Sequence, residues 1–258
     1  GQVYAPPVII RAALQRHRYG SHRHQFADLH LPAEAAGGPL PVAVVVHGGF
    51  WRARYGLELM NALCADLTGR GWAAWNLEYR RLGRRSGGGV PATLDDVAAA
   101  IDHLAALDAP LDLARVVSIG HSAGGQLALW AASRADPRVR LAGAVGQAAV
   151  CDLERAAELQ LGAGVVEAFC GGTPLVRRDA YRLASPAARL PLGVPQLLVH
   201  GEADDTVPSE LSVRYAQAAR AGGDEVTLVL RSADGHFEHL DPGSVAWGAV
   251  VAWLERFA

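Results

Sequence analysis

Short apolar runs alternate with amphipathic stretches along most of this chain. Several of the runs are rich in β-branched residues and end at turn residues, which is typical of buried strands. Predicted strands of this kind lie at 41–46, 72–80, 115–120, 141–150, 194–201 and 225–230. Partial alternation of polar and apolar residues between 13 and 31 predicts two further strands near the start of the chain.

Apolar residues at helical spacing fill most of the intervals between these strands. Helices are predicted at 56–71, 93–107, 209–223 and 244–257, and another is predicted to begin at Ser122. Strands that alternate with helices in this way imply βαβ units, a mostly parallel sheet and helices on both of its faces. We therefore expect residues 1–258 to form a single α/β domain, which the length of the chain allows.

The segment 151–193 interrupts this alternation between two predicted strands. It combines short helical patterns with glycine, proline and arginine. In open α/β sheets, ligands bind at the carboxyl ends of the strands, and an insertion at that edge lies over the binding site. We therefore expect 151–193 to form a small cap over a ligand site.

Net charge, hydropathy and cysteine content exclude several classes of function. The formal net charge is −2, which provides no field for holding a polyanion such as nucleic acid. No apolar run approaches the ~18 residues of a membrane span, and no signal segment is recognisable. The three cysteines form no Cys-x-x-Cys pair, which favours a reducing compartment. We expect a cytoplasmic protein without a nucleic-acid or membrane partner, and the oligomeric state stays open, a homodimer included.

Residues 120–124 read Gly-His-Ser-Ala-Gly, a Gly-x-Ser-x-Gly pattern between a predicted strand and a predicted helix. Glycines allow a turn so tight that it holds the serine in a strained backbone conformation with its hydroxyl exposed. The following helix directs its N-terminal amides toward charge that forms there. The pattern alone would also fit a plain turn, but the strand before it and the helix after it predict Ser122 to be a nucleophile.

A serine hydroxyl becomes a good nucleophile only when a base takes its proton. We predict His236 as this base, because it follows the last predicted strand on a glycine-containing loop; the rival His239 falls in or near the start of the last helix. The imidazole in turn needs a carboxylate to fix its tautomer. Asp204, just after the strand at 194–201, is predicted for this role, and Asp205 is the alternative. Without a catalytic role, both aspartates would be ordinary turn residues.

The stretch 47–52, His-Gly-Gly-Phe-Trp-Arg, follows the predicted strand at 41–46. A tetrahedral oxyanion is stabilised by about two preorganised N–H donors, and glycines let the backbone turn its amides inward. We predict that the amides of Gly49, Phe50 and Ala123 form such an oxyanion hole. His47 is predicted to order the loop.

Lysine is absent, so every one of the 24 lysine or arginine positions is arginine. Schiff-base lysines, lysine bases and the lysine of a phosphate-binding P-loop are therefore excluded. Three histidines near the start could suggest a metal site, but their alternation and the lack of a suitably spaced acid favour a solvated strand edge: His17, His22 and His24. We predict a serine hydrolase that needs no metal or organic cofactor and acts on a small-molecule ester or amide.

Four stretches in this order, HGGFW, GHSAGG, GEADDTVP and GHFEHLDP, resemble the motifs of α/β-hydrolases. They are most similar to the esterase and kynurenine formamidase-like branch, and the similarity begins near residue 20. The resemblance implies the α/β-hydrolase fold, and it implies Asp204 as the acid, because this residue stands midway between Gly201 and Val207. The related pattern His-Gly-Gly-Gly is not matched, since Phe50 replaces its third glycine.

The resemblance implies cleavage of carboxylic esters with small or medium acyl groups through an acyl-enzyme. One alternative is an arylformamidase that hydrolyses N-formylkynurenine, and it rests on the resemblance alone. Another is a catalytically silent α/β-hydrolase that binds a ligand. Such proteins typically lack a member of the catalytic triad, whereas all three candidates are present here.

Side chains beside the motifs are candidates for the walls of a substrate pocket: Trp51, His121 and Phe237. Aromatic residues belong more often to a core than to a ligand site, so these assignments rest only on the neighbouring motifs. Four arginines at 80, 81, 84 and 85 could meet an anionic substrate, but a solvated flexible loop is the favoured interpretation of that stretch.

Overall fold

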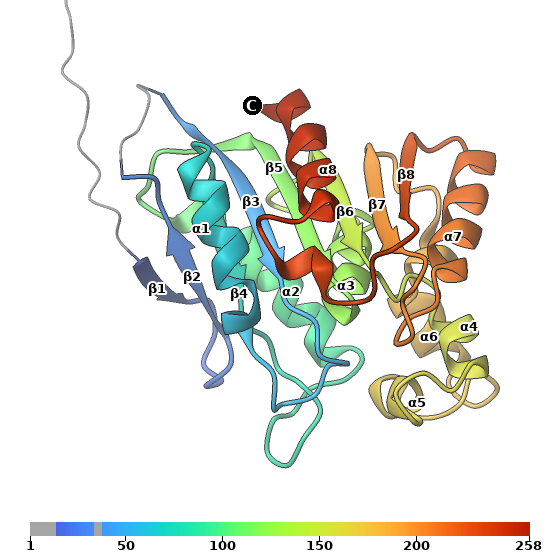
Figure 1. The fold of residues 1–258 in the computed structure, drawn as a ribbon. Coiled ribbons are helices and arrows are strands. Elements are labelled where there is room, and N and C mark those ends of the chain that lie inside the picture. Colours follow the sequence, from blue (N-terminus) through green and yellow to red (C-terminus); the bar gives the residue numbers. More distant parts are fainter. Residues whose placement is uncertain (1–13, 34–37) are drawn as a thin grey trace, which may run out of the picture.

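Eight strands form one sheet in the computed structural model, which describes residues 14–33 and 38–258 (Figure 1). In chain order the strands are β1 (Leu14–Arg18), β2 (Phe26–His30), β3 (Leu40–Val46), β4 (Ala73–Leu77), β5 (Leu111–His121), β6 (Gly143–Gln147), β7 (Gln196–Gly201) and β8 (Val226–Arg231). Their order in the sheet is β1-β2-β4-β3-β5-β6-β7-β8. β2 runs antiparallel to β1 and β4. The other six strands, β4, β3, β5, β6, β7 and β8, are parallel to one another, so the predicted mostly parallel sheet is confirmed.

Helices cover both faces of this sheet, as the alternating pattern predicts. The longer ones are α1 (Asn61–Gly69), α2 (Ala92–His103), α3 (Ala123–Ala132), α7 (Glu210–Ala221) and α8 (Val245–Leu254). Successive side chains of β3 point to opposite faces. Ala43 and Val45 pack against α1 and α8, whereas Val44 faces the core formed with α2, α3 and α7 (Figure 1). All seven residues of β3 are buried, and each buried valine contributes about 1.5–3 kcal/mol.

The predicted insertion between β6 and β7 consists of short helices that gather together in Figure 1. They are α4 (Leu153–Glu158), α5 (Val165–Cys170), α6 (Arg178–Ala184) and the 3₁₀ helix η3 (Pro186–Arg189). Arg52, which follows β3, donates a hydrogen bond from Nη2 to the carbonyl of Gly162 at 2.7 Å. The insertion is thereby joined to the loop that leaves the carboxyl end of β3, where the ligand site is predicted.

Several boundaries differ from the sequence predictions for local structural reasons. The predicted strand at 141–150 ends at Gln147, because Ala148 adopts a left-handed φ of 45° and turns the chain away. β5 begins at Leu111 and pairs there with Leu40, before a register shift that the sequence pattern does not reveal. The helix predicted at 56–71 is divided into the 3₁₀ helix η1 (Leu57–Met60) and α1.

Three further 3₁₀ turns complete the described elements: η2 (Leu104–Ala106), η4 (Glu238–Leu240) and η5 (Glu255–Phe257). η4 contains His239, so this histidine precedes α8 and does not belong to it. Across 14–33 and 38–258, none of the helices combines the length and the apolar character that crossing a bilayer would require.

Candidate active site

Ser122 stands at the sharp turn between β5 and α3, with φ 57° and ψ −121°. A non-glycine residue in this left-handed region costs about 1–3 kcal/mol, so the surrounding structure must hold it there. The Ser122 amide donates to the carbonyl of Gln147 at 2.8 Å, and the Ser122 carbonyl accepts from the amide of Val150 at 3.2 Å. These hydrogen bonds join the turn to the end of β6 and fix the position of the serine.

The two flanking glycines are required by close backbone contacts. A methyl group on Gly120 would collide with the carbonyl of Gly124, and one on Gly124 would collide with the carbonyls of Val46 and His47. The tight turn therefore requires glycine at both positions, as predicted. The missing side chain of Gly124 also lets α3 begin close to the end of β3.

We expect Gly124→Ala to lower the free energy of unfolding by about 1–3 kcal/mol, because backbone atoms would have to move to accept the methyl group. Gly248→Ala in α8 is the matched control, since a methyl group there meets no atom within 4 Å. That substitution should raise the stability by about 0.5–1 kcal/mol through the better helix propensity of alanine. Urea-induced unfolding measures both values, and equal effects at the two glycines would contradict this account.

His236 and Asp204 form a close polar pair in the site. Nδ1 of His236 lies 2.7 Å from Oδ2 of Asp204, and both residues are buried. An ionised carboxylate can only accept hydrogen bonds, so Nδ1 must carry the proton. In the neutral imidazole, Nε2 of His236 is then an acceptor, the state that a general base needs.

The remaining contacts of Asp204 keep this carboxyl group ionised. Oδ1 accepts hydrogen bonds from the amides of Thr206 at 2.9 Å and Val207 at 2.8 Å, and Nε2 of His200 lies 3.3 Å from Oδ2. Burial alone would raise the pKa of Asp204, but the hydrogen bonds from His200, His236 and the Val207 amide outweigh burial and lower the pKa. The alternative acid, Asp205, is exposed and accepts a hydrogen bond from the Thr206 hydroxyl at 3.2 Å.

His200 was not singled out from the sequence, yet its contacts are well defined. Its Nε2 lies 2.8 Å from the carbonyl of Val207, and its Nδ1 lies 2.7 Å from the hydroxyl of Ser212. Because a carbonyl can only accept, Nε2 carries the proton and Nδ1 accepts from Ser212. The sequence signal that could have indicated this second imidazole is a histidine at the end of a buried strand, just before the loop that carries Asp204.

His121 supports the loop that carries His236. Its Nε2 donates to the carbonyl of His236 at 2.7 Å, and the two ring centroids are 4.7 Å apart. Burial lowers the pKa of His121 to about 3, so this imidazole is neutral near pH 7. His239, the rival base, is also buried; burial lowers its pKa to about 4, and neither of its ring nitrogens has a hydrogen-bond partner among the described residues.

The loop after β3 has an unusual backbone. Gly49, Phe50 and Trp51 have φ values of 100°, 51° and 53°, so three successive residues are left-handed. A methyl group on Gly48 would lie 3.1 Å from Cβ of Ser122, which shows how closely the loop approaches the serine. Within the described residues, no protein acceptor receives a hydrogen bond from the amides of Gly49, Phe50 or Ala123. These amides therefore remain available for the oxyanion role predicted from the sequence.

A buried polar network behind the loop holds it in place. Nε2 of His47 lies 3.1 Å from a carboxyl oxygen of Glu78, and Nδ1 lies 2.8 Å from the carbonyl of Gly48, so both ring nitrogens face acceptors. The Tyr79 hydroxyl donates to the His47 carbonyl at 2.7 Å, and the two rings stack at 4.4 Å. Arg81 lies 3.2 Å from Glu78 and compensates the buried charge.

Two arginines of the stretch after β4 were interpreted wrongly from the sequence. Arg81 is buried against Glu78, and Arg80 forms an ion pair with the buried Asp96 at 2.6 Å. A solvated flexible loop fits only Arg84 and Arg85, which are exposed. Charged residues directly after a buried strand were the signal that could have indicated these internal ion pairs.

Ser122, His121 and His236 line one cavity of about 490 Å³. Phe237, predicted as a wall, also lines it and is 66% exposed at its mouth. Trp51 does not line it, so that assignment is wrong. The Trp51 ring is fully buried, stacks on Phe169 at 4.2 Å and donates to Gln126 at 3.0 Å, because its left-handed backbone turns the indole into the core.

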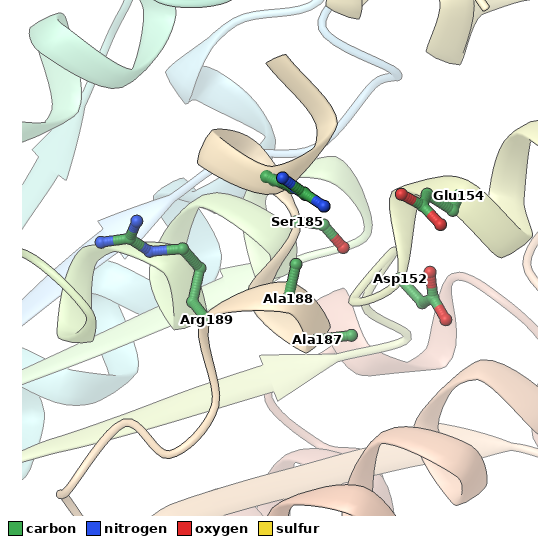
Figure 2. A pocket seen from close by; sticks show the side chains of 7 residues that line it. Asp152, Glu154, Ser185, Ala187, Ala188 and Arg189 are labelled. Carbon is green, nitrogen blue, oxygen red and sulfur yellow. The ribbon is translucent and has the colours of Figure 1, made fainter. Parts of the chain in front are cut away.

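A second hollow of about 500 Å³ lies within the inserted segment and contains none of the candidate catalytic residues (Figure 2). Asp152 and Glu154 border one side of it, and Arg189 borders another. Two of its polar side chains already serve the local structure. Asp152 accepts from the Arg155 amide at 3.1 Å, and Arg189 donates to the Ser133 hydroxyl at 3.0 Å.

Comparison with protein families gives a match to BD-FAE over residues 27–218, which is most of the chain. The chain belongs to the BD-FAE family. The part that matches BD-FAE includes Ser122 and Asp204, whereas His236 lies beyond it. No match was found among curated proteins.

Several solved structures resemble this BD-FAE chain. A truncated carbohydrate esterase from gut microbiota has a TM-score of 0.81 at 18% identity, covering 96% of this chain and 97% of that protein. Esterase B of Lactobacillus rhamnosis has a TM-score of 0.80 at 19% identity, covering 97% and 86%. A bifunctional GH43-CE protein of Bacteroides eggerthii has a TM-score of 0.80 at 21% identity, covering 94% of this chain but only 38% of that longer protein.

These similarities show that the BD-FAE chain has the α/β-hydrolase fold, as its motifs implied. They give no support to the kynurenine formamidase-like branch that the motifs also resembled. Two of these structural relatives are named as esterases.

Proposed function

We propose that this protein is a serine hydrolase of carboxylic esters in which Ser122, His236 and Asp204 form the catalytic triad. The observation that carries the proposal is the buried 2.7 Å pair of His236 and Asp204, whose imidazole lines the same cavity as the strained Ser122. The similar folds of a carbohydrate esterase and of esterase B support an ester as the substrate.

In the proposed reaction, Nε2 of His236 takes the proton of the Ser122 hydroxyl as its oxygen attacks the ester carbonyl. The amides of Gly49, Phe50 and Ala123 donate to the oxyanion of the tetrahedral intermediate. His236 then gives its proton to the alcohol oxygen as the C–O bond breaks, which leaves an acyl-enzyme. Water, deprotonated by His236, releases the acid and restores Ser122.

The cavity fits the predicted acyl size. A volume of about 490 Å³ accommodates small or medium groups, and much of its lining is apolar or aromatic. Phe50, Tyr55 and Phe237 supply the aromatic part of that lining. The chemistry requires no cofactor, because the nucleophile, base and oxyanion donors all come from the chain.

Labelling with a fluorophosphonate tests the nucleophile directly. We expect the wild-type protein to gain the mass of one phosphonyl group, located at Ser122 by peptide mass spectrometry. Ser122→Ala should gain none. Equal labelling of both proteins would remove Ser122 from the proposal.

The two alternatives from the sequence have less support. Arylformamidase activity rests only on motif resemblance, and a direct comparison of p-nitrophenyl acetate with N-formylkynurenine as substrates separates it from esterase activity. A silent ligand-binding protein would bind an ester without turnover, whereas the close pair of His236 and Asp204 beside the cavity of Ser122 supports turnover.

A further inference from the structure

Two arginines, Arg52 and Arg54, line the candidate active-site cavity. Among the described residues no aspartate or glutamate lines it, and the Asp204 carboxylate lies behind His236. Apart from the histidines, the rest of the lining is uncharged, and most of it is apolar or aromatic. The half-buried Arg52 guanidinium is the stronger partner for an anionic group, because the apolar walls reduce screening by water there, whereas the exposed Arg54 is screened more.

Neither guanidinium forms an ion pair with a carboxylate within residues 14–33 and 38–258. Arg52 uses Nη2 to donate to the carbonyl of Gly162, which leaves its other N–H donors for a ligand. The Arg54 guanidinium lies over the ring of Tyr55, 4.7 Å from the centroid. By contrast, Arg80 and Arg81 on the neighbouring loop are neutralised by buried acids.

These two arginines are also placed close to the reacting atoms in sequence and in space. They follow the predicted oxyanion donors Gly49 and Phe50 on the same loop, and Arg52 fastens that loop to the inserted segment. An anionic group of a bound ester would therefore meet them while its carbonyl lies at Ser122. The ionised Asp204 is separated from the cavity by His236, so the arginines are the charged groups that a bound anion would meet first.

We propose that the cavity selects esters that carry a carboxylate away from the scissile bond, with Arg52 and Arg54 as the residues that recognise it. This inference rests on the proposed ester hydrolysis and adds the charge of the substrate to it. The carboxylate can belong to the acyl part, as in a monoester of a dicarboxylic acid, or to the alcohol part, as in an ester of a hydroxy acid. Both share the same chemistry at the guanidinium groups.

Two matched pairs of substrates test the selectivity and distinguish its source. 4-Nitrophenyl hydrogen glutarate and 4-nitrophenyl valerate have acyl chains of similar length and differ in the carboxylate. 4-Acetoxybenzoate and 4-acetoxybenzamide differ in the charge of the alcohol part. We expect kcat/KM to favour the charged member of one pair by about tenfold at low salt, and the preference to shrink in 0.5 M NaCl.

Arginine variants show whether the selectivity belongs to these residues. In Arg54→Gln, and more strongly in Arg52→Gln, the ratio of kcat/KM for the charged and neutral esters should fall toward one. Arg84→Gln is the control, because Arg84 is an exposed arginine outside the cavity, and it should keep the wild-type ratio. Comparing the ratio of each variant with the wild-type ratio cancels the intrinsic difference in reactivity between the two esters of a pair.

The outcomes separate this inference from the function on which it rests. Turnover of the neutral esters with no preference for the charged ones would overturn the inference and leave the esterase proposal standing. A preference that persists in both Arg52→Gln and Arg54→Gln would also overturn it. No turnover of any ester would instead contradict the proposed function. Thermal unfolding checks that Arg52→Gln is folded, and Arg54→Gln tests the exposed arginine independently.

Discussion

Replacing Ser122 with alanine should reduce kcat for p-nitrophenyl acetate by about 10⁵–10⁶-fold, because loss of the nucleophile removes the acyl-enzyme route altogether. The amides of the oxyanion hole would remain, so a small rate above the uncatalysed reaction is expected. Background-subtracted turnover at high enzyme concentration measures the loss, and circular dichroism shows that the fold is retained. Activity within tenfold of wild type would contradict a nucleophilic role for Ser122.

Ser122→Gly provides a second readout that does not depend on activity. Alanine at this position keeps the left-handed φ of 57° and its cost, whereas glycine adopts such a conformation readily. We therefore expect Ser122→Gly to be more stable toward urea than Ser122→Ala, although glycine also gains freedom in the unfolded chain. Both variants should be equally inactive.

Each element of the proposed site comes from the carboxyl end of a different parallel strand. β5 delivers Ser122, β7 is followed by Asp204, β8 is followed by His236, and β3 leads into the loop with Gly49 and Phe50. Parallel strands all end at one edge of the sheet, so residues distant in sequence meet there. This common edge is why the order of motifs along the chain was sufficient to predict a constellation in space.

Features with a local cause could be predicted from the sequence. The apolar run of β3 and the glycines around Ser122 depend on near neighbours, because burial on both faces and a tight turn leave few residue types that fit. The choice of Asp204 over Asp205 came from motif spacing, and the structure places Asp204 next to His236.

Features with a distant cause could not be predicted. Trp51 looked like a pocket wall, but its left-handed backbone and its contacts with Phe169 and Gln126 turn it into the core. The pairing of His47 with Glu78 joins two strands that lie side by side only after folding. A charge pattern on one strand does not reveal its partner on another.

Asp204→Asn should reduce kcat by about 10⁴-fold while the fold is retained. The asparagine oxygen can still accept from the amides of Thr206 and Val207, but its NH₂ group would face Nδ1 of His236. Nδ1 must then become an acceptor, and the proton moves to Nε2, which can no longer take the proton of Ser122. Asp205→Asn is the control, because Asp205 is exposed, and its kcat should stay within about twofold of wild type.

The same pair of variants has a pH dependence of stability that can be measured without substrate. The pKa of Asp204 is lowered in the folded protein, so its ionised form stabilises the fold above the ordinary aspartate pKa of about 3.9, and this contribution is lost as the pH falls further. The stability advantage of the wild-type protein over Asp204→Asn should therefore begin to shrink as the pH is lowered from about 5 to 3, and it should go on shrinking below pH 3. Urea unfolding at each pH gives the difference. Two results would contradict an ionised Asp204 held by His236 and His200. One is a stability difference between wild type and Asp204→Asn that stays constant over this pH range, and the other is the same pH-dependent difference for Asp205→Asn.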